Sequence, residues 1–250
     1  MNTFTLSLFF LVGLLFGSFY NVVGLRLPKQ LSFIMNRSNC IHCSHQLHWY
    51  ELIPILSFLC LKGRCSKCSN RISYLYPLIE ISTGLLFVYS YLMLGWNSEL
   101  IIALLLVSML MIITVSDLTY MVIPNKLLLF FLPLFFILRI IYPLTPWWSP
   151  LLGGLLGVCI TMFIILISRG GMGAGDMKLF GVLGIVLGYE KLLLCFFLSC
   201  VVGAVFGMLL LVIKKIQRKQ PVAFGPYIVI ATLITYFYGD AIIDWYFRYL

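Results

Sequence analysis

The sequence predicts an all-α polytopic membrane protein with about eight transmembrane helices and one small zinc-stapled cytoplasmic loop. Hydrophobic residues make up 62% of the 250 residues, and charged residues make up only 10%. The mean hydropathy of +1.07 excludes an ordinary soluble domain. Apolar stretches long enough to cross a bilayer recur along the chain and are joined by short polar links.

Eight helices are expected at the apolar stretches 4–23, 76–94, 100–116, 126–142, 151–168, 177–187, 191–213 and 222–238. The first stretch has no basic residues before it and no small-residue cleavage site after it, so it should be a retained helix and not a signal peptide. The sixth stretch is the shortest. These breaks divide the chain into a first transmembrane helix at 1–24, a Cys-rich loop domain at 25–75 and a membrane domain of seven helices at 76–250.

The distribution of basic residues predicts the orientation of these helices. Only Arg139, Lys191 and Arg248 fall on one side, and the other basic residues gather in the loop, in the run 214–219 and in short links on the opposite side. By the positive-inside rule that basic side is cytoplasmic, and both termini lie outside. The orientation of the helices in the membrane therefore accounts for the net charge of +9, and we expect no direct binding of nucleic acid.

Two aspartates are predicted at the cytoplasmic ends of helices. Asp117 follows the stretch 100–116, and Asp176 begins the stretch 177–187 after a glycine-rich turn. Burying an acid near hydrocarbon costs at least about 2.5–3.5 kcal/mol on insertion scales, so such an acid indicates a function. Two neighbouring carboxylates have different pKa values, so one is charged while the other stays protonated. The charged one can activate water, and the protonated one can donate to a peptide carbonyl. The pair therefore predicts an aspartyl hydrolase.

The residues beside Asp176 fit this hypothesis. Gly173 and Gly175 permit close approach of an extended peptide to the backbone. We group Lys178 with these two glycines as support for the substrate or the backbone.

Structural interpretations of the two acids stay open. Asp176 can cap the helix that follows it. Alternatively, Asp117 pairs with Lys126 and Asp176 pairs with Lys178. A histidine-assisted serine or cysteine site within the helices is excluded, because all three histidines lie in the polar loop. No HExxH motif of a metalloprotease occurs either.

Two C-x-x-C pairs lie in the loop, Cys40 with Cys43 and Cys65 with Cys68. Four thiolates at this spacing can close a tetrahedral zinc site, and a cytosolic loop argues against structural disulfides. A redox pair or free thiols are the alternatives, and His42 or His45 could replace a thiolate. The other four cysteines lie in apolar runs and are expected to be packing residues.

The chain resembles the type IV prepilin leader peptidases, membrane aspartyl proteases of the Gly-x-Gly-Asp class, over nearly its whole length. The resemblance lies in an ordered set of segments together with the cysteine pairs. These segments are Gly17-Ser18-Phe19-Tyr20-Asn21-Val22, Arg26-Leu27-Pro28, Glu51-Leu52-Ile53-Pro54 with Ser57, Tyr76-Pro77-Leu78-Ile79-Glu80, Asp117-Leu118 through Ile123-Pro124-Asn125, Gly173-Ala174-Gly175-Asp176-Met177-Lys178, and Phe224-Gly225-Pro226.

The resemblance implies cleavage of the leader of type IV prepilins or pseudopilins at the cytoplasmic face of a bacterial plasma membrane. Asp117 and Asp176 match the family's catalytic pair. Members with the cysteine domain also methylate the new N-terminus with S-adenosylmethionine, and Glu51 and Glu80 could serve the amine or that cofactor. Equally, Glu51 could be a solvated loop residue and Glu80 a favourable charge near a helix N-terminus.

Two other classes of protein remain as alternatives. A proton-coupled transporter would use Asp117 and Asp176 as a protonation site. Carriers, however, usually bind their substrate at the bilayer midplane, and both acids are predicted at one interface. The other alternative is an assembly scaffold for a secretion or uptake machine, which would need neither acid for binding its partners.

Overall fold

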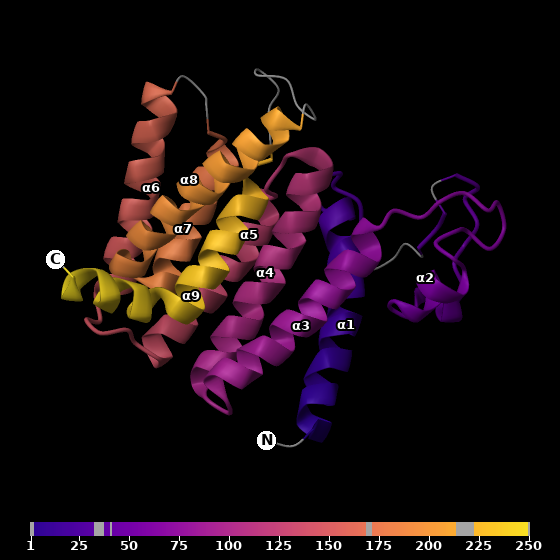
Figure 1. Ribbon diagram of the computed structural model, residues 1–250, viewed down its shortest axis with the longest axis horizontal. Helices are drawn as coiled ribbons and strands as arrows, with labels where there is room; N and C mark the ends of the chain where they lie inside the picture. The colour runs from indigo at the N-terminus through magenta and orange to yellow at the C-terminus, as the bar shows by residue number, and fades with distance from the viewer. Residues whose placement is uncertain (1–2, 33–37, 41, 169–171, 214–222, 250) are drawn as a thin grey trace. The chain divides into compact units, whose positions relative to one another are not determined.

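The computed structural model describes residues 3–32, 38–40, 42–168, 172–213 and 223–249, and these residues are almost entirely helical (Figure 1). They contain one short 3-10 helix, η1 (Trp49–Leu52), and no strand. The α-helices are α1 (Thr3–Arg26), α2 (Leu56–Cys60), α3 (Leu75–Leu94), α4 (Ser98–Tyr120), α5 (Asn125–Ile141), α6 (Ser149–Ile167), α7 (Ala174–Leu187), α8 (Tyr189–Val212) and α9 (Gly225–Arg248). Arg37, Arg169, Gly171 and the basic run 214–219 lie outside the described residues.

The prediction of an all-α membrane protein is confirmed. Each of the eight expected stretches is a helix, and within the described part of the chain six of them are long and apolar enough to cross a membrane. The two shorter helices are α5 and α7. Five helix ends differ from the prediction by three or more residues. α1 continues to Arg26, α7 begins at Ala174 and so includes Asp176, and α9 begins only at Gly225. The other two are the ends of α4 and α9. α4 continues to Tyr120 and so includes Asp117, and α9 continues to Arg248, with Asp240 of its added turns paired to Lys191 at 2.7 Å.

The chain divides into two compact units, residues 1–115 and 116–250, with the boundary inside α4. In the first unit, α1 packs closely against α3 because α1 carries glycines one turn apart. A Cβ atom on Gly13 would lie 2.7 Å from the Cα of Gly84, and one on Gly17 would lie 2.8 Å from the Cα of Glu80. Small residues at this spacing are typical of helices that associate within a membrane.

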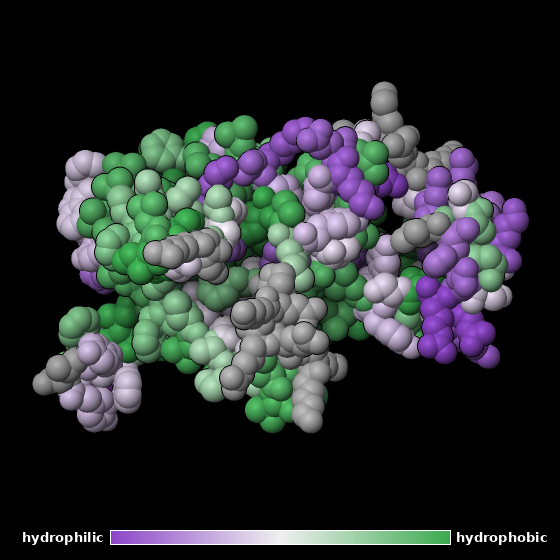
Figure 2. Space-filling view, turned by 90° about the horizontal axis from the view of Figure 1, so that it is seen from above, coloured by the Kyte–Doolittle hydropathy of each residue, from purple (hydrophilic) through white to green (hydrophobic). Residues whose placement is uncertain are grey.

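The loop between α1 and α3 is the polar part of this first unit (Figure 2). It contains η1 and α2, and backbone hydrogen bonds in tight turns hold it together. In contrast to the helices, it buries few large apolar side chains. Its stability must therefore come from other interactions, and these lie around its cysteines.

In the second unit, glycines again bring two helices together. Gly153 and Gly157 of α6 face the backbone of α7 at Gly184 and Phe180, so closely that a larger residue would have no room. Arg139 of α5 is buried and donates two hydrogen bonds, of 3.0 and 2.8 Å, to the carbonyl of Val186 near the end of α7. A cation at this position stabilises the helix C-terminus.

Candidate functional site

Asp117 lies in the last turn of α4, and its carboxylate is held by the start of α9. Only 5% of the residue is exposed. Its Oδ2 accepts a hydrogen bond of 2.8 Å from the amide of Gly225, the first residue of α9. The amides and the positive dipole end of a helix N-terminus favour a negative charge. A Cβ atom on Gly225 would lie 2.6 Å from Oδ2, so only glycine permits this approach.

The chain turns sharply after Asp117 and returns towards α7. Met121 takes a left-handed conformation with φ 53°, and the hydroxyl of Ser116 donates to the carbonyl of Val122 at 2.5 Å. This turn places Ile123 against Gly175, where an added Cβ would lie 3.1 Å from the Cβ of Ile123. Gly175, the second residue of α7, thus lies in close contact with the segment that follows Asp117.

Asp176 is the third residue of α7 and is also buried, with 8% exposed. Its Oδ2 accepts a hydrogen bond of 3.1 Å from the amide of Gly173, the residue before the helix. The carboxylates of Asp117 and Asp176 lie close enough to interact electrostatically. The structure therefore brings together the two acids that the sequence singled out, each at the N-terminus of a different helix.

The interpretation of these acids as members of ion pairs finds no support. Among the described residues, no lysine or arginine forms an ion pair with Asp117 or Asp176. Lys178 donates instead to the side-chain oxygen of Asn125, at 2.9 Å. Lys178 thus ties α7 to the start of α5. The capping interpretation of Asp176 is correct as geometry, since its carboxylate accepts a hydrogen bond from the amide before the helix, and the carboxylate also interacts electrostatically with Asp117.

The four loop cysteines of the first unit form one cluster. The Sγ atoms of Cys40 and Cys68 lie 3.8 Å apart, those of Cys43 and Cys65 lie 3.9 Å apart, and all four lie within 4.8 Å of one another. Zinc bound at about 2.3 Å by four thiolates in a tetrahedron requires sulfur atoms about 3.8 Å apart. The cluster therefore fits a metal site with four cysteine ligands.

The two C-x-x-C turns repeat the same local structure. In the first, Cys40 N donates to His45 O and Ser44 takes φ 55°. The second repeats this pattern, with Cys65 N donating to Asn70 O and Ser69 at φ 57°. The sequence Cys-x-x-Cys-Ser occurs in both turns, and sequence reasoning noted the pairs but not this repeat.

Burial and hydrogen bonding give the thiols of Cys40 and Cys43 different pKa values. Amides of Cys43 and His42 donate to the sulfur of Cys40 and lower its pKa to about 6. The His45 amide acts in the same direction on Cys43, but burial and the neighbouring sulfurs outweigh it and raise the pKa of Cys43 to about 11. Four adjacent thiols cannot all ionise unless a cation compensates their charge, which is what a metal supplies.

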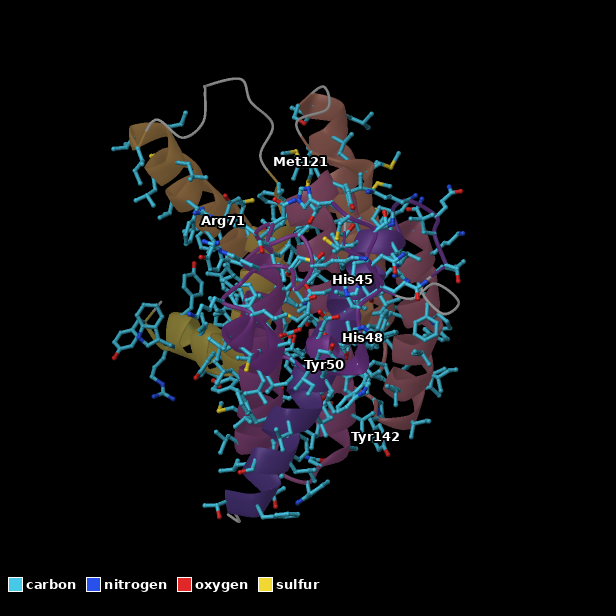
Figure 3. The ribbon with its side chains drawn as sticks, turned by 90° about the vertical axis from the view of Figure 1, so that its right-hand side faces the viewer. His45, His48, Tyr50, Arg71, Met121 and Tyr142 are labelled. Atoms are coloured by element: carbon cyan, nitrogen blue, oxygen red, sulfur yellow. The ribbon has the colours of Figure 1, made fainter. Side chains whose placement is uncertain are left out.

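Glu51 is buried inside this loop and connects its two halves. Its carboxylate accepts hydrogen bonds from the Ser66 hydroxyl and, at 2.7 Å, from the His48 amide, and the ring of His45 lies 3.5 Å from it. Burial raises the pKa of Glu51, but these hydrogen bonds and the nearby histidines outweigh burial and lower it. Figure 3 shows His45, His48 and Tyr50 in succession on this loop. The rings of His48 and Tyr50 are stacked, with their centroids 5.3 Å apart.

Glu80 lies in α3 of the same unit and is 7% exposed. It accepts a hydrogen bond of 2.8 Å from the amide of Ile55 and interacts with the side chain of Ser18. Glu51 and Glu80 thus have separate surroundings in the first unit.

Of the remaining cysteines, Cys195 is buried as expected, whereas Cys60, Cys159 and Cys200 are exposed, so packing inside the protein explains only Cys195.

The fold and the sites together define a class of protein: a helical, multi-pass membrane protein with a pair of buried aspartates and a loop whose four clustered cysteines could hold a metal ion. Comparison with known proteins agrees with this class. Residues 11–94 match the bacterial peptidase A24 N-terminal domain, and residues 104–208 match the type IV leader peptidase family. No solved structure matches the chain.

Curated relatives extend the match to almost the full length. The chain is 42% identical to a prepilin leader peptidase/N-methyltransferase of Bacillus subtilis, over 97% of this chain and 98% of that protein. Proteins of the same name from Aeromonas salmonicida and Pseudomonas aeruginosa are 35% and 32% identical, each over 96% of this chain and over 93% and 92% of their own length. The chain belongs to the type IV leader peptidase family. Nothing in these matches supports a transporter.

Sequence reasoning missed the role of one residue beside the acids. Gly225 entered only as part of a family-like segment, although its amide holds Asp117. A glycine followed by a proline at the start of a helix was the available signal, since proline is favoured in the first turn. Nothing in the sequence connects that turn with an acid 108 residues away.

Proposed function

We propose that this protein is a membrane aspartyl endopeptidase that removes the leader peptide of type IV prepilins or pseudopilins and then methylates the new N-terminus. The observation that carries the proposal is the pair of buried carboxylates, Asp117 and Asp176, each anchored by a helix N-terminal amide. The family to which the chain belongs and the names of its relatives support the same chemistry.

The mechanism follows from the geometry of the pair. With one carboxylate charged and the other protonated, the charged group takes a proton from water as the water oxygen attacks the peptide carbonyl. The protonated group donates its proton to the carbonyl oxygen. When the tetrahedral intermediate collapses, the C–N bond breaks and the leaving amine receives a proton from the pair. The amides of Gly225 and Gly173 keep the two carboxylates oriented throughout.

The surroundings of the acids suit a substrate with an apolar segment. Leu118, Met121 and Val122 lie next to Asp117 in the sequence and are exposed by 49%, 56% and 47%. Gly173, the residue before α7, has no side chain and so allows an extended chain to approach its backbone. Gly175 supports the backbone instead, through its close contact with Ile123. We assign the acids to the cytoplasmic face of a bacterial plasma membrane, with both termini outside, because the basic loop residues favour that orientation.

The loop at 25–75 is proposed to bind zinc through Cys40, Cys43, Cys65 and Cys68, and the metal would staple the two C-x-x-C turns. We treat this loop as a domain between the first transmembrane helix at 1–24 and the peptidase domain at 76–250. The methyl donor is proposed to be S-adenosylmethionine, which supplies an activated methyl group.

The test is cleavage of a prepilin by membranes containing the wild type, Asp117→Asn or Asp176→Asn at equal abundance. We expect the wild type to release the leader and both variants to lose cleavage. Gly207→Ala is the matched control in the same unit, since a Cβ there meets nothing within 4 Å. The mass of the mature N-terminus then shows whether a methyl group has been added. Undiminished cleavage by either Asn variant would reject the aspartyl mechanism.

A further inference from the structure

An unpaired polar atom lies near Glu80 in the first unit. Asn21 of α1 is 1% exposed, and its side-chain amide donates a 3.1 Å hydrogen bond to the carbonyl of Tyr76 at the start of α3. Its Oδ1 has no hydrogen-bond partner. Tyr76 and Glu80 are four residues apart, so they lie on the same face of α3, one turn from each other. The side-chain amide of Asn21 therefore lies at the turn of α3 next to Glu80, and its oxygen is unpaired there.

The close packing of α1 and α3 directs both groups to one place. Gly17 is one turn from Asn21 on α1, and a Cβ on Gly17 would lie 2.8 Å from the Cα of Glu80. Because the helices are this close, the side chains of Glu80 and Asn21 both emerge from the interface between α1 and α3. We call this part of the interface the seam. Ser18, which interacts with Glu80, belongs to this seam as well.

The loop segment over Glu80 has an unusual backbone. Ile55 takes φ 60° and ψ −51°, and Leu56 N donates to Pro54 O at 2.6 Å. These values describe a γ-turn of the rare and strained kind, which is especially unfavourable for a β-branched residue. The amide of Ile55 points at the Glu80 carboxylate, 2.8 Å away. Strain of this sort persists where the surrounding structure holds it, and it is frequent at functional sites.

We propose that Glu80 and Asn21 form the binding site for a primary ammonium group, which is the α-amine of the mature pilin after cleavage. This inference rests on the proposed methylation. The seam offers two acceptors, one of them a carboxyl group, and a buried acceptor without a partner is costly unless a donor arrives. Among the described residues no lysine, arginine or histidine forms an ion pair with Glu80. An ammonium group supplies both the charge and the donors that the seam lacks.

The site also prepares the amine for methylation. An ammonium nitrogen has no lone pair and cannot accept a methyl group. Glu80 is the proton acceptor in this seam: one N–H bond breaks, its electron pair stays on nitrogen, and the proton moves to the Glu80 carboxylate. Asn21 Oδ1 then accepts a hydrogen bond from the neutral amine and orients its lone pair. A methyl sulfonium donor, when bound, would supply the methyl group: the nitrogen lone pair forms the N–C bond as the S–C bond of the donor breaks, the donor leaves as a neutral thioether, and the positive charge passes to the secondary ammonium product.

The experiment compares Glu80→Gln and Asn21→Leu with the wild type in two measurements. Glutamine keeps an acceptor for the Ile55 amide and removes only the charge, and leucine removes the unpaired oxygen at similar volume. The first measurement is the ratio of methylated to unmethylated mature pilin at complete cleavage. The second is binding, without methyl donor, of a synthetic peptide with the N-terminal sequence of that mature pilin, compared with its N-acetylated twin.

We expect both variants to cleave like the wild type and to lose methylation. The wild type should bind the free-amine peptide at least about tenfold more tightly than the acetylated twin, as charge-assisted hydrogen bonds predict, and Glu80→Gln should erase this difference. Ser90→Ala is the control, since that buried hydroxyl in α3 bonds only to its own helix at Leu86. Thermal unfolding in detergent separates lost binding from lost folding.

The outcomes are distinguishable from failure of the proposed function. A wild type that cleaves but never methylates would reject methylation, while the peptide measurement would still decide the ammonium site. Equal binding of the two peptides to the wild type, or unchanged methylation by stable Glu80→Gln protein, would overturn the site. If Asn21→Leu unfolds and Glu80→Gln behaves as the wild type, the seam is purely structural and the proposal is wrong.

Discussion

Substitution of Gly225 by alanine tests whether the start of α9 positions Asp117. The new Cβ would lie 2.6 Å from Oδ2 of Asp117, whereas ordinary contact begins at 3.4 Å. Opening this gap would stretch the 2.8 Å hydrogen bond beyond the range in which such bonds hold. A hydrogen bond to a charged group contributes about 1.5–3 kcal/mol, and a displacement approaching 1 Å at a catalytic group costs about 100-fold in rate. We therefore expect cleavage to fall by about 100-fold.

The assay is the initial rate of prepilin cleavage at equal amounts of folded protein in membranes. The matched control is Gly207→Ala in α8, where the Cβ meets nothing within 4 Å and alanine favours the helix by about 0.5–1 kcal/mol. Thermal unfolding in detergent should show that both variants remain folded. If Gly225→Ala cleaves as fast as Gly207→Ala, the amide of Gly225 does not position Asp117 and the reasoning fails.

Three further predictions concern the loop and Lys178. Cys68→Ser should lose bound zinc and make the loop sensitive to protease, whereas Cys60→Ser, outside the cluster, should keep both properties; equal zinc content would refute the four-cysteine site. Glu51→Gln should weaken the loop by about 1–3 kcal/mol in hydrogen exchange, because the Ser66 and His48 donors lose an ionised acceptor. The pKa of Glu51 is lowered, so its contribution should be complete above the usual 4.5 and should fade as the pH falls through the lowered value; a difference between wild type and variant that persists in acid would contradict this. Lys178→Met removes only the hydrogen bond to Asn125, since Lys178 forms no ion pair with Asp176, so cleavage should fall by less than about tenfold. A loss of cleavage as large as that of Asp176→Asn would show that the lysine acts in the reaction.

Both acids are placed by the same physical device. Each carboxylate lies where a helix begins, so an amide and the positive end of a helix dipole offset part of the cost of burying its charge. The device orients the acids without a basic side chain, which would hold them permanently ionised. Neutral donors orient an acid and still allow it to gain and lose a proton during the reaction.

Most of the fold could be predicted from the sequence, because the hydrocarbon core of a membrane restricts which backbone structures can cross it. Backbone groups in a membrane must bond within their own segment, so each long apolar stretch had to be a helix. The spacing of Cys40, Cys43, Cys65 and Cys68 likewise predicted one cluster, because short C-x-x-C turns bring their sulfurs together locally. The helices and each C-x-x-C turn depend on residues close together in the chain, whereas the cluster joins the two turns across 22 to 28 residues.

The contacts between helices could not be predicted, and the tertiary structure alone decided them. Membrane helices are apolar on nearly all sides, so periodicity does not reveal which face meets which partner. The bond from Gly225 to Asp117, the strained turn at Ile55 and the unpaired oxygen of Asn21 all arise where distant segments meet. The sequence by itself determined which residues are acids, glycines and cysteines and which stretches are helical. Only packing decided which amide each carboxylate received, because that depends on contacts between segments far apart in the chain.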